Sequence, residues 1–134
     1  MNDKIKLMQI VKKKPKAEGL ASWSKTAERY APGRYELLTG VGEKDSLKKV
    51  EEFQPEIVLL LSIAEDGNLK NGLRLVKEIK RLSSRTMIFV IFDMLDDEEE
   101  VFDEYIGGGA YKCYTSPASM DALFHDMYVA LNKE

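Results

Sequence analysis

The sequence has few of the side chains from which catalytic and metal sites are commonly built. It contains one cysteine, Cys113, and one histidine, His125, in 134 residues. A single cysteine excludes an internal disulfide framework and a cysteine-based zinc site. Cys113 and His125 have no evident third residue to orient them, so they do not predict a nucleophile–base pair. We therefore expect no enzymatic activity.

Long apolar runs and a strong net charge are also missing. No apolar run reaches the roughly 20 residues that a membrane-spanning helix needs. The N-terminal apolar stretch precedes the Lys12–Lys14 triplet, an order that does not match a secretion signal. The formal net charge of −3 is too small to indicate nucleic-acid binding. We expect a cytoplasmic protein with one domain over residues 1–134, either complete or cut from a longer chain, and without nucleic-acid or membrane partners.

The sequence does have a regular alternation of two apolar periodicities. Continuous apolar runs at 57–61 and 87–92 are typical of strands that are buried on both faces of a parallel sheet. Three shorter strand candidates lie at 5–11, 35–39 and 110–114, and a segment with helical apolar spacing follows each of the five. Strands joined through helices predict an α/β fold, with a parallel sheet between two helical layers.

Local signals mark the ends of the last two helices. Ser119 is expected to cap the last helix, and Gly107–Gly109 to end the one before it. The acidic run Asp96–Glu100 suits the start of that earlier helix, where the N-terminal dipole favours negative side chains, and it predicts a solvated face there. The alternative interpretation is that these acidic residues steer a basic partner. The apolar face of the same helix is expected to comprise Val101, Phe102, Tyr105 and Ile106.

Several segments, taken in order, resemble the receiver domain of two-component response regulators. They are YELLTGVGEKDSLKKV, PEIVLLL followed by EDGNLKNGLRLVKEIKR, and GGGAYKCYTSP. The resemblance covers nearly the whole chain and implies a flavodoxin-like, doubly wound three-layer sandwich with strand order 2-1-3-4-5. In such a fold the site lies beyond the carboxyl ends of the strands. In this family, carboxylates there hold Mg²⁺ around an acceptor aspartate, while a hydroxyl residue and a lysine contact the phosphoryl group.

Matched residue by residue, this chain departs from the family at each of those positions. The acidic pair falls on Lys12 and Lys13, and the acceptor aspartate falls on Leu61. The other counterparts are Phe92, Asp93 or Met94 for the hydroxyl residue, Ser116 for the lysine, and Cys113 for the aromatic residue that reports the switch.

These replacements remove the phosphorylation chemistry. Leu61 has no lone pair, so it can neither attack a phosphoryl group nor bind a metal. Lys12 and Lys13 would repel Mg²⁺, since a unit charge pair 4 Å apart at an effective dielectric of 20 is worth about 4 kcal/mol. The resemblance therefore implies a pseudo-receiver that binds no metal and no cofactor and cannot be phosphorylated.

Protein–protein interaction in a phosphorelay pathway is the function that then remains. The implied partner is a histidine kinase or an output protein, together with self-association into a homodimer. Receivers usually dock through the fourth helix, the fifth strand and the fifth helix. The candidate docking residues of this chain are Phe102, Tyr105, Tyr111, Tyr114 and Met120.

An alternative of a different class is an α/β domain that binds a small anionic ligand or a nucleotide. Lys12–Lys14 would supply the charge, because they precede a helix N-terminus and such termini bind phosphate. No glycine-rich loop accompanies them. A solvated cluster that neutralises Asp93 or Asp66 explains the same lysines without a ligand.

Overall fold

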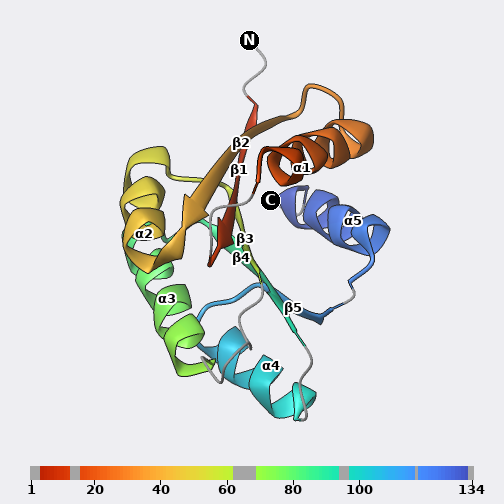
Figure 1. Cartoon of the computed structure of the whole chain (residues 1–134). Helices are drawn as coiled ribbons and strands as arrows, with labels where there is room; N and C mark the ends of the chain where they lie inside the picture. The colour runs from red at the N-terminus through yellow and green to blue at the C-terminus, as the bar shows by residue number, and fades with distance from the viewer. Residues whose placement is uncertain (1–3, 13–15, 62–68, 94–96, 117, 133–134) are drawn as a thin grey trace.

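Five strands alternate with five helices in the computed structural model, which describes residues 4–12, 16–61, 69–93, 97–116 and 118–132. This confirms the predicted element order (Figure 1). The strands are β1 (Ile5–Val11), β2 (Tyr35–Val41), β3 (Ile57–Leu61), β4 (Met87–Phe92) and β5 (Lys112–Thr115). The helices are α1 (Ala17–Tyr30), α2 (Gly42–Phe53), α3 (Leu69–Leu82), α4 (Glu98–Gly107) and α5 (Met120–Leu131).

The strands form one parallel sheet in the order β2-β1-β3-β4-β5, as predicted. Helices α1 and α5 cover one face of this sheet, and α2, α3 and α4 cover the other (Figure 1). The fold is therefore the expected doubly wound three-layer sandwich. Because every strand runs in the same direction, the residues that end the strands share one edge, which we call the carboxyl edge; the opposite edge is the amino edge.

The centre of the sheet is buried on both faces. Along β3, Val58 and Leu60 pack towards α2, α3 and α4, while Ile57 and Leu59 pack towards α1 and α5. All four are at most 1% exposed. A strand that is buried on both faces has apolar side chains at successive positions, which explains the unbroken apolar run at 57–61.

Two neighbouring residues of α4 test the predictions for this helix. Tyr105 is 0% exposed, so its assignment to the apolar face is confirmed and its assignment to the docking surface is wrong. Ile106 is 45% exposed, so its assignment to the buried face is also wrong. One residue along an α-helix turns the side chain by about 100°, and the packing of Tyr105 into the sheet therefore points Ile106 outwards.

The start of α5 and the end of α4 both follow their predictions. Ser119 Oγ accepts a hydrogen bond from the backbone N–H of Ala122 at 3.2 Å, as an N-cap should. Helix α4 ends at Gly107, and Gly109 adopts a φ of +121°, which a side chain would strain. Strand β5 begins at Lys112, two residues later than expected, because the backbone N–H of Ala110 still bonds the carbonyl of Tyr105 in the preceding turn.

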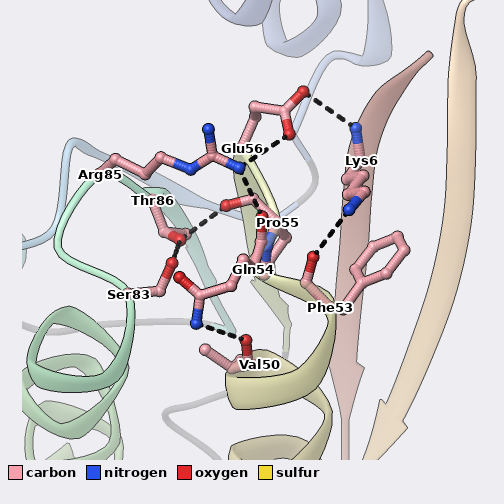
Figure 2. Close-up of polar contacts among 9 residues, drawn as sticks. All are labelled: Lys6, Val50, Phe53, Gln54, Pro55, Glu56, Ser83, Arg85 and Thr86. Carbon is pink, nitrogen blue, oxygen red and sulfur yellow. Dashed lines mark hydrogen bonds and ion pairs between the residues drawn. The ribbon is translucent and has the colours of Figure 1, made fainter. Parts of the chain in front are cut away.

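A polar network joins the two loops that lead into β3 and β4 at the amino edge (Figure 2). Gln54 adopts a left-handed φ of 49°, and its side-chain amide donates to the carbonyl of Leu82 at 3.1 Å. Thr86 Oγ1 lies 2.6 Å from the carbonyl oxygen of Pro55, to which it donates, and 2.6 Å from Ser83 Oγ. The two loops are thus joined by hydrogen bonds of the buried Ser83 and Thr86 and of the half-buried Gln54.

Replacing Thr86 by valine is expected to lower the free energy of unfolding by about 1–3 kcal/mol, because the buried carbonyl of Pro55 loses its donor. Urea denaturation measures this change. Thr26→Val is the matched control: the Thr26 hydroxyl bonds the carbonyl of Ser22 on an exposed helix surface, so its loss should cost less than about 0.5 kcal/mol. Equal losses in both variants would contradict the structural role of the buried network.

Candidate functional site at the carboxyl edge

A small pocket of about 210 Å³ lies at the carboxyl edge, where β1 and β3 end beside the first turns of α2 and α3. Most of its lining is apolar. The lining residues are Ile10, Val11, Lys12, Gly42, Glu43, Leu60, Leu61, Asn71, Gly72 and Leu75. The structure therefore brings Lys12 and Leu61 together, two of the residues that the sequence matched to the phosphorylation site. Lys13 and Lys14 lie outside the described residues.

Leu61 is the last residue of β3, at the position where the resemblance expects the acceptor aspartate. It pairs in register with Ile91 of β4, and its half-buried side chain packs against the apolar cluster beneath α1 and α5. The strand thus ends in a hydrocarbon side chain that continues the core, and this side chain supplies neither a nucleophile nor a metal ligand.

The end of β4 is also apolar. Phe92 is 0% exposed, and its ring meets Tyr105 edge-on at 4.8 Å and stacks on Phe102 at 5.7 Å. Of the three positions matched to the hydroxyl residue, Phe92 therefore lies in the core beneath α4, Asp93 is half-buried just after the strand, and Met94 is outside the described residues.

Ser116, the residue matched to the family's lysine, follows the end of β5. Its backbone N–H donates to the carbonyl of Phe92 at 2.7 Å, and its side chain is exposed. Thr115, one residue earlier, donates its hydroxyl to Glu98 at the start of α4 at 2.8 Å. The edge of the sheet at β4 and β5 is thereby connected to α4 without a cationic side chain at position 116.

The carboxylates on the α2 side of this edge already have partners. Glu43 forms an ion pair with Arg74 of α3 at 3.1 Å. Asp45 accepts a hydrogen bond from the backbone N–H of Val41 at 2.9 Å and pairs with Lys49 at 3.1 Å. These contacts, the backbone bond first, lower the pKa of Asp45.

The magnesium ion that the fold implies does not fit this lining. Mg²⁺ requires a near-octahedral set of oxygen ligands, whereas Lys12 and Leu61 bring a cation and a hydrocarbon to the described pocket. Across the described ranges, no group of three or more His, Cys, Asp or Glu side chains could hold a metal ion. The same apolar lining does not favour an anion or nucleotide bound through Lys12.

Cys113 and His125 lie on opposite sides of the sheet. Cys113 is 8% exposed and packs into the cluster beneath α2, α3 and α4, while His125 is an exposed residue of α5. Burial raises the pKa of the Cys113 thiol to about 12, so the thiol stays protonated and unreactive. The structure therefore brings no nucleophile–base pair together from these two residues.

Three of the candidate docking residues lie on β5 or on the segments that flank it in the chain. Tyr111 is 41% exposed and Met120 is 37% exposed, while Tyr114 is half-buried. The Tyr114 hydroxyl donates to Asp126 of α5 at 2.7 Å, and Lys112 pairs with the same carboxylate at 2.9 Å. Burial opposes ionisation of Asp126, yet the bonds from Lys112 and Tyr114 hold its pKa below the ordinary value. Tyr114 is thus anchored on α5 and Tyr111 is accessible.

Helix α4 adds a strongly acidic surface to this region. We call it the acidic face, formed by the exposed side chains Asp97, Glu98, Glu99, Glu100, Asp103 and Glu104, which border one open groove. Phe102 is half-buried between this face and the core, and Ile106 is exposed beside it. The acidic run in the sequence pointed to a solvated helix, but only the packing of Tyr105 and Phe102 shows which side of α4 faces outwards.

The described helices include none long and apolar enough to cross a membrane.

No protein-family model matches the sequence, and no curated protein sequence matches it. Solved structures do match the fold. A response regulator from Thermotoga maritima has a TM-score of 0.76 at 12% identity, with 97% of this chain and 99% of that chain covered.

Two further structures agree with this match. A two-component response regulator from Clostridium difficile has a TM-score of 0.75 at 13% identity, over 97% of this chain and 98% of that one. A CheY-like receiver domain from Methanospirillum hungatei has a TM-score of 0.72 at 13% identity, over 98% and 96%. The chain therefore has the flavodoxin-like fold of response-regulator receiver domains.

Proposed function

We propose that this chain is a receiver-like signalling module that is not phosphorylated and acts by binding another protein. The observation that carries the proposal is the side chain at the end of β3. Leu61, which the resemblance matches to the acceptor aspartate, ends β3 and packs against the apolar core. A phosphoryl group needs an oxygen or nitrogen nucleophile, and a leucine side chain has neither.

The surroundings of Leu61 support the same conclusion. Phe92 is buried at the end of β4, and Ser116, which the resemblance matches to the family's lysine, has no positive charge to bind phosphoryl oxygens. Several independent positions therefore depart together from what aspartyl phosphorylation requires, and a single error in the matching of one loop would not restore the chemistry.

Incubation with acetyl phosphate and Mg²⁺ is expected to leave the intact mass of the chain unchanged. A receiver that keeps its acceptor aspartate serves as the positive control. Beryllofluoride with Mg²⁺ should likewise leave the melting temperature unchanged, since ligand-induced stabilisation requires binding to the folded state. A mass increase of one phosphoryl group on the wild-type chain would overturn the proposal, whereas labelling of Leu61→Asp alone would assign the loss to that one residue.

The docking surface of the proposed module is the acidic face together with Tyr111 and Ile106. Ile106 is exposed on the same helix as the acidic face, and Tyr111 adds an exposed aromatic side chain just before β5. Exposed apolar side chains combined with a field of one charge suit a partner with a basic, partly apolar surface. Two copies of the acidic face would repel each other at close approach. The charge distribution therefore favours a basic partner protein over a homodimer formed through α4.

A photo-reactive amino acid placed at Tyr111 is expected to crosslink a defined partner in cells. The same probe at Val129 of α5, which is 38% exposed against 41% for Tyr111, is the matched control. Capture at position 111 should fall when Glu99 and Asp103 are both changed to lysine, because charge reversal removes the electrostatic complementarity. A partner that is captured equally by both probes, or equally by the charge-reversed variant, would contradict docking on this surface.

A further inference from the structure

A second and larger pocket lies at the amino edge, on the side of the sheet covered by α1 and α5. It is bounded by the end of α1, the turn that leads into β2, and the outer side of α5. Its volume of about 920 Å³ falls within the range of small-molecule sites, which is roughly 300–1,000 Å³. It is far from Leu61, and its role does not depend on the function proposed above.

Aromatic rings form the floor and one wall of this amino-edge pocket. Phe124 of α5 is 4% exposed and lies at the base. The Tyr30 ring stacks on Phe124 with a centroid distance of 4.7 Å, and the Tyr35 ring meets it edge-on at 6.0 Å. Phe124 is covered by these two rings, and the half-buried Tyr30 and Tyr35 give the pocket an aromatic lining against which a planar ligand ring can pack.

Arg34 is held over the rim by its backbone. Its N–H donates to the carbonyl of Ala31 at 3.1 Å, and its carbonyl accepts from the N–H of Ile5 at 2.8 Å. The guanidinium lies 5.5 Å from the centre of the Tyr128 ring, and Tyr128 is 55% exposed. The buried Nε of Arg34 finds no hydrogen-bond partner among the described residues. The lining thus contains an arginine whose backbone is fixed and whose Nε has no hydrogen-bond partner among the described residues.

The charges of the lining favour an anion. Lys4 and Arg34 carry permanent positive charges, and His125 adds a further nitrogen donor. The one carboxylate of the lining, Asp121, accepts the hydrogen bond of the Tyr30 hydroxyl, a contact that raises the pKa of Tyr30. Two cations against one carboxylate make this pocket locally positive in a chain whose formal net charge is −3.

We propose that the amino-edge pocket binds a small ligand that combines an aromatic ring with an anionic group, of the nucleoside phosphate class. The ring stacks against Tyr128 and the neighbouring aromatic wall, and Arg34 and Lys4 bind the phosphate. Arginine suits this role because its planar fork donates several hydrogen bonds to phosphate oxygens and also stacks on rings.

Isothermal titration calorimetry with ATP in the presence of a chelator tests the site. The wild-type chain is expected to bind ATP with a Kd below about 1 mM, and more tightly than either adenosine or inorganic triphosphate, because each of these lacks half of the recognised chemistry. Arg34→Gln should weaken ATP binding by about tenfold or more, since it removes a charged hydrogen-bond donor. Tyr128→Ala, at a largely exposed position, should weaken it without disturbing the core.

Two control variants separate this site from other sources of binding. Arg81→Gln removes an exposed arginine of α3 that pairs with Glu78, and it should leave the Kd for ATP unchanged. Lys12→Gln should also leave it unchanged, because Lys12 lies at the carboxyl edge. The proposal is overturned if ATP does not bind, if triphosphate binds as tightly as ATP, if Lys12→Gln abolishes binding, or if Arg34→Gln and Tyr128→Ala both keep the wild-type Kd.

Discussion

Replacing Tyr105 by alanine is expected to lower the free energy of unfolding by about 3–5 kcal/mol, the usual cost of removing a fully buried aromatic ring. Tyr105 is 0% exposed, meets Phe92 edge-on, and donates its hydroxyl to the carbonyl of Leu69 at the start of α3. The side chain therefore attaches α4 to both the sheet and α3. Since small domains have a total stability of roughly 5–15 kcal/mol, this loss would be a large fraction of the whole.

Tyr105→Phe is the matched control for this prediction. It keeps the ring in the core and removes only the bond to the Leu69 carbonyl, so its cost should be about 1 kcal/mol. Urea denaturation followed by circular dichroism measures both variants. A loss below about 1 kcal/mol for Tyr105→Ala would show that Tyr105 is not packed in the core, and would restore it as a candidate docking residue.

Cys113 is expected to react with an alkylating reagent about a thousandfold more slowly in the folded chain than in the urea-unfolded chain near pH 8. Burial raises the pKa of its thiol from 9.0 to about 12. Because the thiolate is the reactive species, the raised pKa leaves about a thousandth of the thiolate that a free cysteine would have. Mass spectrometry of timed samples gives the two rates. Alkylation of the folded chain at the unfolded rate would contradict the burial of Cys113.

The same thiol makes stability depend on pH in a defined direction. Its pKa is higher in the folded chain than in the unfolded chain, so its contribution to stability is complete below pH 9 and is lost as the pH rises towards about 12. The loss is at most about 1.4 kcal/mol for each pH unit in that window. Cys113→Ala removes the titrating group, and its stability should therefore decline less than that of the wild-type chain between pH 9 and 11.

The order of elements and the topology of the sheet could be predicted because they depend on local patterns. The apolar runs at 57–61 and 87–92 are unbroken because β3 and β4 are covered on both faces. Ser119 and Gly109 mark helix ends through backbone requirements that belong to a few neighbouring residues. Patterns of this kind are visible in a single sequence.

The residues at the carboxyl edge could also be predicted, because they are the residues that end each strand. Counting along the strands assigned Leu61 and Ser116 to their positions, and the structure places both at that edge. Counting did not decide which of Phe92, Asp93 and Met94 matches the family's hydroxyl residue, because the exact end of β4 depends on its pairing with β3 and β5. The register is set by the pairing between strands, so it cannot be predicted from the sequence of one strand.

The sequence by itself determined the fold class and that Leu61, a hydrocarbon side chain, is the last residue of β3, because hydrophobic periodicity and residue chemistry are local properties. Only the tertiary structure decided that Tyr105 is buried while Ile106 is exposed, since the rotation of α4 is set by its contacts with Phe92 and Leu69. It alone also brought Lys4, Arg34 and Tyr128 together at the amino edge. Those residues are far apart in the chain, and a pocket formed by distant segments leaves no pattern in any one of them.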